Sequence, residues 1–138
     1  MEVKHETLPY QISDEKDLLD KERIYSWLST TYWASERSKE IIMNSIENSL
    51  CFGLYHEGGQ AGFVRVVSDY ATISWVCDVF VDPTHRGRGL SKWLMEVMVE
   101  HPAIRHTSMI LATRDAHGLY EQYGFTRREM MRRPVIEA

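Results

Sequence analysis

The stretch Asp82-Pro83-Thr84-His85-Arg86-Gly87-Arg88-Gly89-Leu90-Ser91 joins an apolar run, Val76 to Val81, to an amphipathic run, Leu90 to His101. This order predicts a buried strand, a proline-containing turn, a glycine-rich turn and a helix. Two glycines allow a tight turn and a close approach of the backbone to a ligand. The first amides of a helix lack partners within it and lie at the positive end of its dipole. The stretch is therefore predicted to bind the phosphate or pyrophosphate of a cofactor.

A glycine pair between a strand and a helix can also be only a tight connection, so this motif needs its context. Lys92 stands where the third glycine of a dinucleotide-binding fingerprint would fall, and no Gly-Lys-Ser/Thr follows. These differences argue against a dinucleotide-binding fold and against a nucleoside triphosphatase.

The length and composition predict one domain spanning residues 1–138, because 138 residues with 43% hydrophobic content suffice for one core. No apolar run approaches the roughly 20 residues that span a bilayer. The first six residues, Met1 to Glu6, lack the basic and apolar regions of a secretory signal. We therefore expect a cytoplasmic protein that does not bind membranes.

The cysteines, the charge and the histidine spacing exclude several classes of site. Cys51 and Cys77 lie in apolar runs and are expected to be buried free thiols. No Cys-x-x-Cys or His-x-x-x-His pattern is present, so no metal site is expected. A net charge of −4 argues against nucleic-acid binding. One basic cluster is expected to be the solvated edge of the last strand: Arg127, Arg128, Arg132 and Arg133.

The periodicity of apolar residues predicts a mixed α/β fold. Strands are predicted at 10–12, 51–56, 60–68, 72–81, 108–112 and 125–132, and helices at 20–29, 35–49, 90–101 and 116–123. Ser35 is the expected N-cap of the second helix, and Gly124 is expected to end the last one. The strand over 72–81 is mostly apolar and is expected to be central. Antiparallel strands come first and a strand–helix–strand crossover follows.

Two segments of the chain resemble the GNAT superfamily of acyl-CoA-dependent N-acyltransferases. Val79-Phe80-Val81-Asp82-Pro83 followed by Arg86-Gly87-Arg88-Gly89-Leu90-Ser91 is similar to the family's pyrophosphate loop, Gln/Arg-x-x-Gly-x-Gly/Ala. Ala116-His117-Gly118-Leu119-Tyr120-Glu121-Gln122-Tyr123-Gly124-Phe125 is similar to the family's Ala-x-x-Leu-Tyr-x-x-x-Gly-Phe segment. The resemblance covers the whole chain in element order. It implies a GNAT-like α/β fold, a central mixed sheet with about four helices.

The chain departs from the family pattern at three places. Ser91 occupies the place of the loop's last glycine or alanine, and its small side chain and intact N–H should preserve phosphate binding. Thr113 stands where the family often has asparagine, which puts one side-chain contact to the cofactor in doubt. Only thirteen residues follow Phe125, so the C-terminal strand region is expected to be shortened.

The resemblance implies acetyl-CoA as the co-substrate. Pantetheine would lie between two splayed strands, against Val79 and Val81, and the Val79–Phe80 backbone would donate to the thioester oxygen. Backbone amides from Arg86 to Ser91 would hold the pyrophosphate, helped by the arginine charges. The implied cofactor-binding residues are Val79, Phe80, Val81, Arg86, Gly87, Arg88, Gly89, Leu90, Ser91, Thr113 and Tyr120.

The resemblance also implies a catalytic acid, whereas the base stays open. Tyr120 matches the tyrosine that protonates the departing thiolate, although buried tyrosines often only pack, and Tyr123 is the alternative. The family's strand glutamate is replaced here by Trp75. Asp78 is the only acid within that strand. It is either the proton acceptor or a hydrogen-bonded structural residue, and a water chain is the third possibility.

The acceptor pocket of the family lies at the loop between the first two helices, here 29–34. Its aromatic side chains Tyr32 and Trp33, together with Trp75, are the predicted substrate-binding residues, although core packing would explain them equally well. The predicted function is acetyl transfer from acetyl-CoA to a primary amine of a small molecule in a ternary complex. The alternative is a non-catalytic acyl-CoA-binding or regulatory module. Association as a homodimer is possible.

Overall fold

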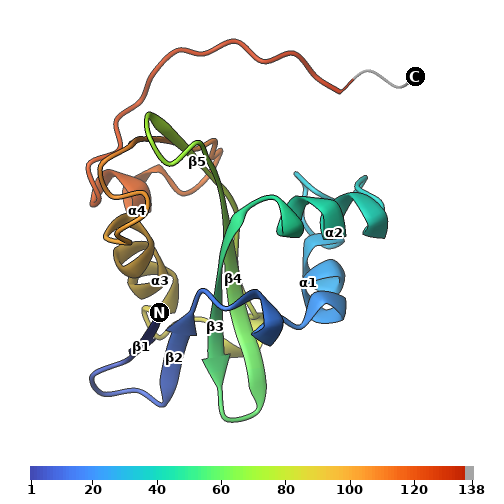
Figure 1. The fold of residues 1–138 in the computed structure, drawn as a ribbon, viewed down its shortest axis with the longest axis vertical. Coiled ribbons are helices and arrows are strands. Elements are labelled where there is room, and N and C mark those ends of the chain that lie inside the picture. Colours follow the sequence, from blue (N-terminus) through green and yellow to red (C-terminus); the bar gives the residue numbers. More distant parts are fainter. Residues whose placement is uncertain (136–138) are drawn as a thin grey trace.

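The computed structural model describes residues 1–135 and contains one six-stranded sheet with four α-helices (Figure 1). The strands are β1 (Glu2–Lys4), β2 (Tyr10–Ser13), β3 (Leu50–His56), β4 (Gly59–Ser68), β5 (Ile73–Val81) and β6 (Ser108–Ile110). The helices are α1 (Lys21–Leu28), α2 (Lys39–Glu47), α3 (Leu90–Val99) and α4 (His117–Glu121), with 3-10 turns η1 (Lys16–Leu18) and η2 (Pro83–His85). The spatial order is β1-β2-β3-β4-β5-β6, antiparallel except for the parallel pair β5–β6. The predicted mixed α/β fold is confirmed.

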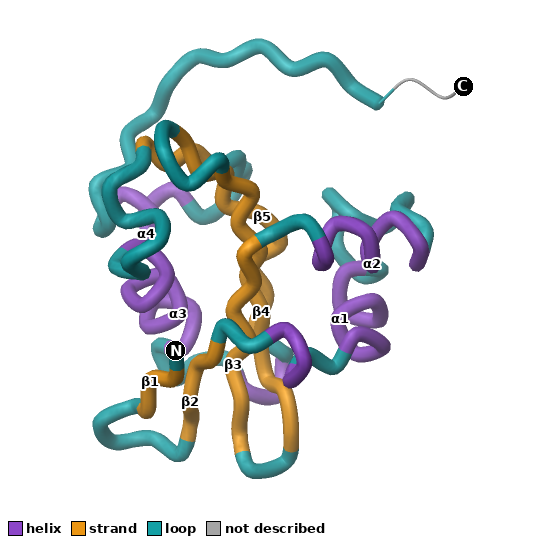
Figure 2. Tube along the Cα trace, in the orientation of Figure 1, coloured by secondary structure: helices purple, strands orange, loops and turns teal. Residues whose placement is uncertain are grey.

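The helices form two layers, one on each face of the sheet. Figure 2 shows α1 and α2 on one side of the strands and α3 and α4 on the other. A first apolar cluster joins the sheet to α3 through residues such as Phe52, Leu90 and Leu94. A second joins the opposite face to α1 and α2 through residues such as Phe63 and Ile42. The sheet is thus buried on both faces, which fixes its strands between two cores.

Each of the first two helices begins at a side-chain cap. Asp20 accepts a hydrogen bond from the Arg23 amide at 3.0 Å, and Ser38 accepts one from the Ile41 amide at 3.2 Å. The predicted cap at Ser35 and the helix start there are wrong. Residues 31–36 form turns instead, because the side chains of Trp33 and Arg37 are bound to β5 and draw this segment away from a helical path.

The C-terminal part of the sheet differs from the prediction. The strand predicted over 125–132 is wrong, since these residues are extended but pair with no strand. β6 is three residues long instead of five and pairs only with the first part of β5. β5 is not central: it lies second from the end of the sheet. β1 pairs with β2 and was not predicted, because three residues are too few to show an alternation.

The predictions that Gly124 ends the last helix and that both cysteines are free thiols are confirmed. Gly124 has a φ of 85°, and its amide donates to the Glu121 carbonyl at 3.2 Å, as expected for a glycine after a helix end. Both thiols are free, but only Cys51 is buried as predicted; Cys77 is partly exposed, so the prediction of its burial is wrong. Within residues 1–135, no helix is both long and apolar enough to cross a bilayer. The same residues contain no cluster of three or more His, Cys, Asp or Glu side chains that could hold a metal ion.

Candidate active site

The two parallel strands diverge after a short shared segment. β5 pairs with β6 only over Ile73 to Trp75, whereas β5 itself continues to Val81. Along residues 76–81, the side of β5 that faces away from β4 therefore has no strand partner in the described part of the chain. An unpaired strand edge presents free N–H and C=O groups. This geometry can accept an extended amide-containing ligand as if it were an additional strand.

A β-bulge interrupts β5 in the middle of this free edge. Arg65 of β4 pairs with Cys77, and Phe63 pairs with Phe80, so two residues of β5 stand opposite Val64 alone. Asp78 has a φ of 55°, which an L-residue other than glycine, asparagine or aspartate rarely adopts. The regular alternation of side chains along a strand is interrupted here. The bulge bends β5 and re-aims the backbone beside it.

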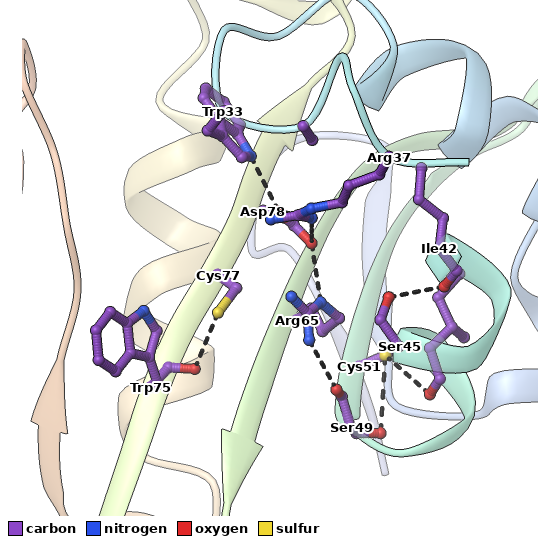
Figure 3. Close-up of polar contacts among 12 residues, drawn as sticks. Trp33, Arg37, Ile42, Ser45, Ser49, Cys51, Arg65, Trp75, Cys77 and Asp78 are labelled. Atoms are coloured by element: carbon purple, nitrogen blue, oxygen red, sulfur yellow. Dashed lines mark hydrogen bonds and ion pairs between the residues drawn. The ribbon is translucent and has the colours of Figure 1, made fainter. Parts of the chain in front are cut away.

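Three donors hold the Asp78 carboxylate at the bulge (Figure 3). Arg65 Nε donates to Oδ2 at 2.8 Å, and Arg37 donates to both oxygens at 3.0 and 3.1 Å. The Trp33 indole N–H donates to Oδ1 at 2.9 Å. The Asp78 side chain is 1% exposed, that of Arg65 10% and that of Arg37 29%. A carboxylate this buried needs such partners, and they fasten the loop before α2 to the strand.

The glycine loop after β5 has the backbone that the motif predicts. Gly87 and Gly89 have φ values of 82° and 75°, so both need the freedom of glycine. A Cβ atom at either position would meet no atom within 4 Å, so the space above the loop is open. The first α-helical bond of α3 runs from the Trp93 amide to the Gly89 carbonyl at 3.0 Å. The amides of residues 90–92 are therefore free of helical partners, which suits a phosphate ligand.

The two loop arginines take different directions. Arg86 turns back onto β5, where its Nε donates to the Val81 carbonyl at 2.8 Å and its guanidinium lies 5.2 Å from the centre of the Phe80 ring. Arg88 instead reaches β2 and donates to the Tyr10 hydroxyl at 2.6 Å. Both side chains are exposed enough to add positive charge near the loop.

Tyr120 lies on α4 and is partly buried against the α3 core. Burial raises the pKa of its phenol above the ordinary value, and the neighbouring Tyr32 and Asp115 add to the shift. Its hydroxyl makes no hydrogen bond with any side chain or backbone group in residues 1–135. A phenol of this kind stays protonated at neutral pH and has a proton to donate.

Tyr123, the alternative acid, is already engaged. Its hydroxyl donates to the Lys92 carbonyl at 3.0 Å and lies 3.2 Å from a Glu96 carboxylate oxygen. Burial and the Glu96 charge raise the pKa of this phenol to about 12. These contacts tie the end of α4 to α3, which is a structural role.

The predicted acceptor residues are only partly brought together. Tyr32 and Trp33 are 50% and 40% exposed and pack edge to face, with ring centres 5.0 Å apart. Arg114, from the loop before α4, covers the Tyr32 ring at 3.6 Å. Trp75 lies on β5, and Figure 3 shows its ring pointing away from Asp78. Tyr32 therefore connects the loop before α2 with the Tyr120 region, whereas Trp75 stands apart from the Asp78 cluster.

Thr113 has a local partner in the structure. Its hydroxyl accepts a hydrogen bond from the Ala116 amide at 3.0 Å, which shapes the entry to α4. The predicted contact of Thr113 with the cofactor stays a prediction.

Sequence reasoning missed Arg37, Arg65 and Arg114. Arg65 carried a usable signal, because it is a lone charge in the apolar run Gly62 to Val67. A charge inside a buried strand requires a counter-charge nearby, and Asp78 is the only acid of the next strand. Arg37 and Arg114 lie in loops whose course no periodicity describes.

A comparison with known families finds a match over more than half of the chain. Residues 47–127 match the family model described as an acetyltransferase (GNAT) domain. A candidate acetyltransferase of Gibberella zeae is 27% identical, with 78% of this chain and 74% of that protein covered. The match over 47–127 contains the free edge of β5, the glycine loop and α4, which are the three parts that build the site.

Solved structures give the same result. A candidate GNAT-family acetyltransferase from Xanthomonas campestris pv. campestris is 44% identical and superposes with a TM-score of 0.87, covering 91% of this chain and 93% of that chain. At 15% identity, N-acetylglutamate synthase from Neisseria gonorrhoeae, complexed with coenzyme A and N-acetyl-glutamate, shares the fold with a TM-score of 0.65. That comparison covers 83% of this chain and 27% of the synthase.

Proposed function

Because the chain belongs to the GNAT acetyltransferase family, we propose that it transfers an acetyl group from acetyl-CoA to a primary amine of a small molecule, directly within a ternary complex. The observation that carries this proposal is the continuous path from the free edge of β5 into the glycine loop at the start of α3. One part of the path suits an amide-rich arm, and the other suits phosphates.

The residues present fit this co-substrate. The free edge of β5 at Val79 to Val81 would bind the pantetheine arm, and the amides from Arg86 to Ser91 would hold the pyrophosphate. When bound, acetyl-CoA supplies an activated acetyl group as a thioester. The open space above Gly87 and Gly89 supports this placement, since larger residues would fill it.

In this proposal Tyr120 is the general acid. Its raised pKa keeps the proton on the phenol, and its hydroxyl, which has no partner within residues 1–135, is available to the leaving thiolate. Tyr32 and Trp33 would contact the acceptor amine through their exposed faces. Trp75 has weaker support as an acceptor contact, because its ring points away from this cluster.

For Asp78, the contacts favour a positioning role over proton acceptance. Both of its oxygens already accept hydrogen bonds from Trp33, Arg37 and Arg65. We propose that Asp78 holds the bulge of β5 and the loop before α2 in place, and that the amine loses its proton to water. Direct proton acceptance by Asp78 stays a prediction that a variant tests below.

The occupied carboxylate of Asp78 also supports a second candidate function. With its strand carboxylate occupied by three donors, the domain would bind acyl-CoA without transferring the acyl group. A screen of primary amines with acetyl-CoA, detecting free thiol, separates the two. Amine-dependent thiol release supports the enzyme, whereas binding with no release for any amine class supports the binding module.

Calorimetry and thermal melting with CoA and acetyl-CoA test the binding step. Saturation at a hundredfold excess over the dissociation constant should stabilise the fold by ~2.7 kcal/mol. Gly89→Glu should abolish binding, because the side chain would bring negative charge into the loop. Gly58→Glu, in the turn between β3 and β4, is the matched control and should bind like the parent. A folded parent that shows no stabilisation at millimolar ligand would refute the proposal.

We also propose a homodimer. β6 forms the end of the sheet, and its outer edge has no partner in residues 1–135. The segment 126–135 is extended and exposes Met130, Met131 and Val135 to 51%, 96% and 88%. An extended segment with exposed apolar side chains can pair with an open edge of a second copy.

A further inference from the structure

A side chain from β2, three strands away from β5, contacts one arginine of the glycine loop. Tyr10 belongs to β2 and precedes Arg88 by 78 residues, yet Arg88 donates to its hydroxyl at 2.6 Å. Tyr10 itself is 4% exposed and belongs to the α3 core. A buried tyrosine has little rotational freedom, so the oxygen that Arg88 contacts is fixed in place.

A second contact orients the Tyr10 hydroxyl. His85 Nδ1 lies 2.6 Å from it, and the two rings meet edge to face with centres 5.5 Å apart. Since Arg88 can only donate, the phenol proton of Tyr10 is free to point to a neutral His85. Burial lowers the pKa of His85, which favours that neutral form. The ring of His56 covers Tyr10 at 4.9 Å and completes the packing.

Arg88 has no carboxylate partner in the described residues, so its charge is not neutralised within this part of the fold. It stands between the two glycines that open the loop. A free arginine in such a place would lose much of its side-chain freedom on binding a phosphate. An arginine that is already held by a hydrogen bond has lost part of that freedom before the phosphate binds.

We propose that Tyr10 is a positioning residue that holds Arg88 ready for the pyrophosphate of CoA. This inference rests on the proposed binding of CoA and adds to it a residue outside both sequence motifs. Arg86 needs no such residue, because its guanidinium is tied to β5 itself.

A double-mutant cycle measured by calorimetry with CoA tests the proposal. The variants are Tyr10→Phe, which keeps the ring, Arg88→Met, and the two combined. Tyr10→Phe should weaken CoA binding about three- to tenfold. In the Arg88→Met background the same change should have less than about a twofold effect, because coupled residues are not additive. Parental affinity in Tyr10→Phe, or an equal loss in both backgrounds, would overturn the inference.

Two controls separate this result from other causes. Tyr55→Phe removes a neighbouring hydroxyl that makes no hydrogen bond in residues 1–135, and it should leave CoA affinity unchanged. Dephospho-CoA should show the same loss as CoA, since both carry the pyrophosphate, and a loss confined to CoA would overturn the assignment. If Gly89→Glu abolishes binding but Tyr10→Phe does not weaken it, only this inference fails. If the parent binds no CoA, the proposed function fails.

Discussion

Tyr120 and Tyr123 show how environment separates two similar side chains three residues apart. Both phenols have raised pKa values. The Tyr123 hydroxyl is hydrogen-bonded to α3, whereas the Tyr120 hydroxyl has no partner in the described residues. Both phenols are therefore protonated at neutral pH, but only the Tyr120 hydroxyl is without a hydrogen-bond partner among residues 1–135.

Tyr120→Phe should lower kcat by ~10²-fold or more and change CoA affinity by no more than a few-fold, because the ring still packs and only the acidic hydroxyl is lost. Steady-state kinetics with the best amine, together with CoA calorimetry, measure both quantities. Tyr123→Phe is the matched control, and a larger loss of kcat there would assign the acid to Tyr123. Because burial raises the pKa of Tyr120 above the ordinary value of a phenol, its ionisation should lower kcat only at strongly alkaline pH.

Asp78→Asn should mainly lower the stability of the fold and should have a smaller effect on the rate of the reaction. Removing one charge from a buried ion pair leaves the partners unpaired and typically destabilises by ~3–5 kcal/mol. We expect a clearly lower melting temperature, with the pH dependence of kcat for any remaining folded enzyme unchanged. If Asp78 accepts the proton, the variant that remains folded would instead lose ~10²-fold or more in kcat.

At the scale of elements, the turn between β4 and β5 is built by one aspartate. Asp69 Oδ1 accepts the amides of Ala71, Thr72 and Ile73 at 2.9, 2.7 and 3.1 Å, and Oδ2 accepts the Thr72 hydroxyl at 2.5 Å. The Thr72 hydroxyl and then these amides hold the pKa of Asp69 well below its usual range. This turn sets the register in which β5 returns along β4, and so positions the free edge.

The pKa of Asp69 gives a pH prediction with a definite sign. A carboxylate whose pKa is lower in the folded state stabilises the fold above its unfolded pKa, and that contribution is lost as pH falls. The parent should therefore lose stability on acidification below about pH 4 more steeply than Asp69→Asn does. Urea unfolding at several pH values measures both slopes. Parallel slopes would show that the turn does not depend on this charge.

The elements that the sequence predicted well have clear local signals. The strands of the hairpin β3–β4 are apolar runs on either side of a Gly-Gly turn, and the glycine loop and α4 lie within motifs. The bulge at Asp78 and the link between Tyr10 and Arg88 depend on contacts between distant parts of the chain. The pattern of apolar residues within one segment cannot predict such contacts. The strand predicted over 125–132 failed for a related reason, since a strand exists only where another strand pairs with it.

At the scale of the whole molecule, the segment 126–135 leaves the body after α4 and runs across the top of Figure 1. It carries four arginines and one glutamate, opposite in sign to the net charge of −4 of the chain. Charge complementarity would guide such a segment to the body of a second copy.

A chain ending at Thr126 should keep its fold, because residues 127–135 are exposed and belong to neither core. If the homodimer uses this segment, the parent should sediment as a dimer and the shortened chain as a monomer. Circular dichroism provides the check on folding. A monomeric parent, or a shortened chain that still dimerises, would contradict this arrangement.

The divergence of β5 from β6 also makes the protein more prone to aggregate when no CoA is bound. An apolar strand with an uncovered hydrogen-bonding edge is a template for aggregation. The donor substrate would then act as a protective cap as well as a reactant. Light scattering during slow heating should rise at a lower temperature for the empty enzyme than for the enzyme with CoA. Val79 lies on this edge, and replacing it by proline should delay aggregation of the empty form while weakening CoA binding. The same strand edge would then determine both how long the protein stays in solution and how tightly it binds CoA.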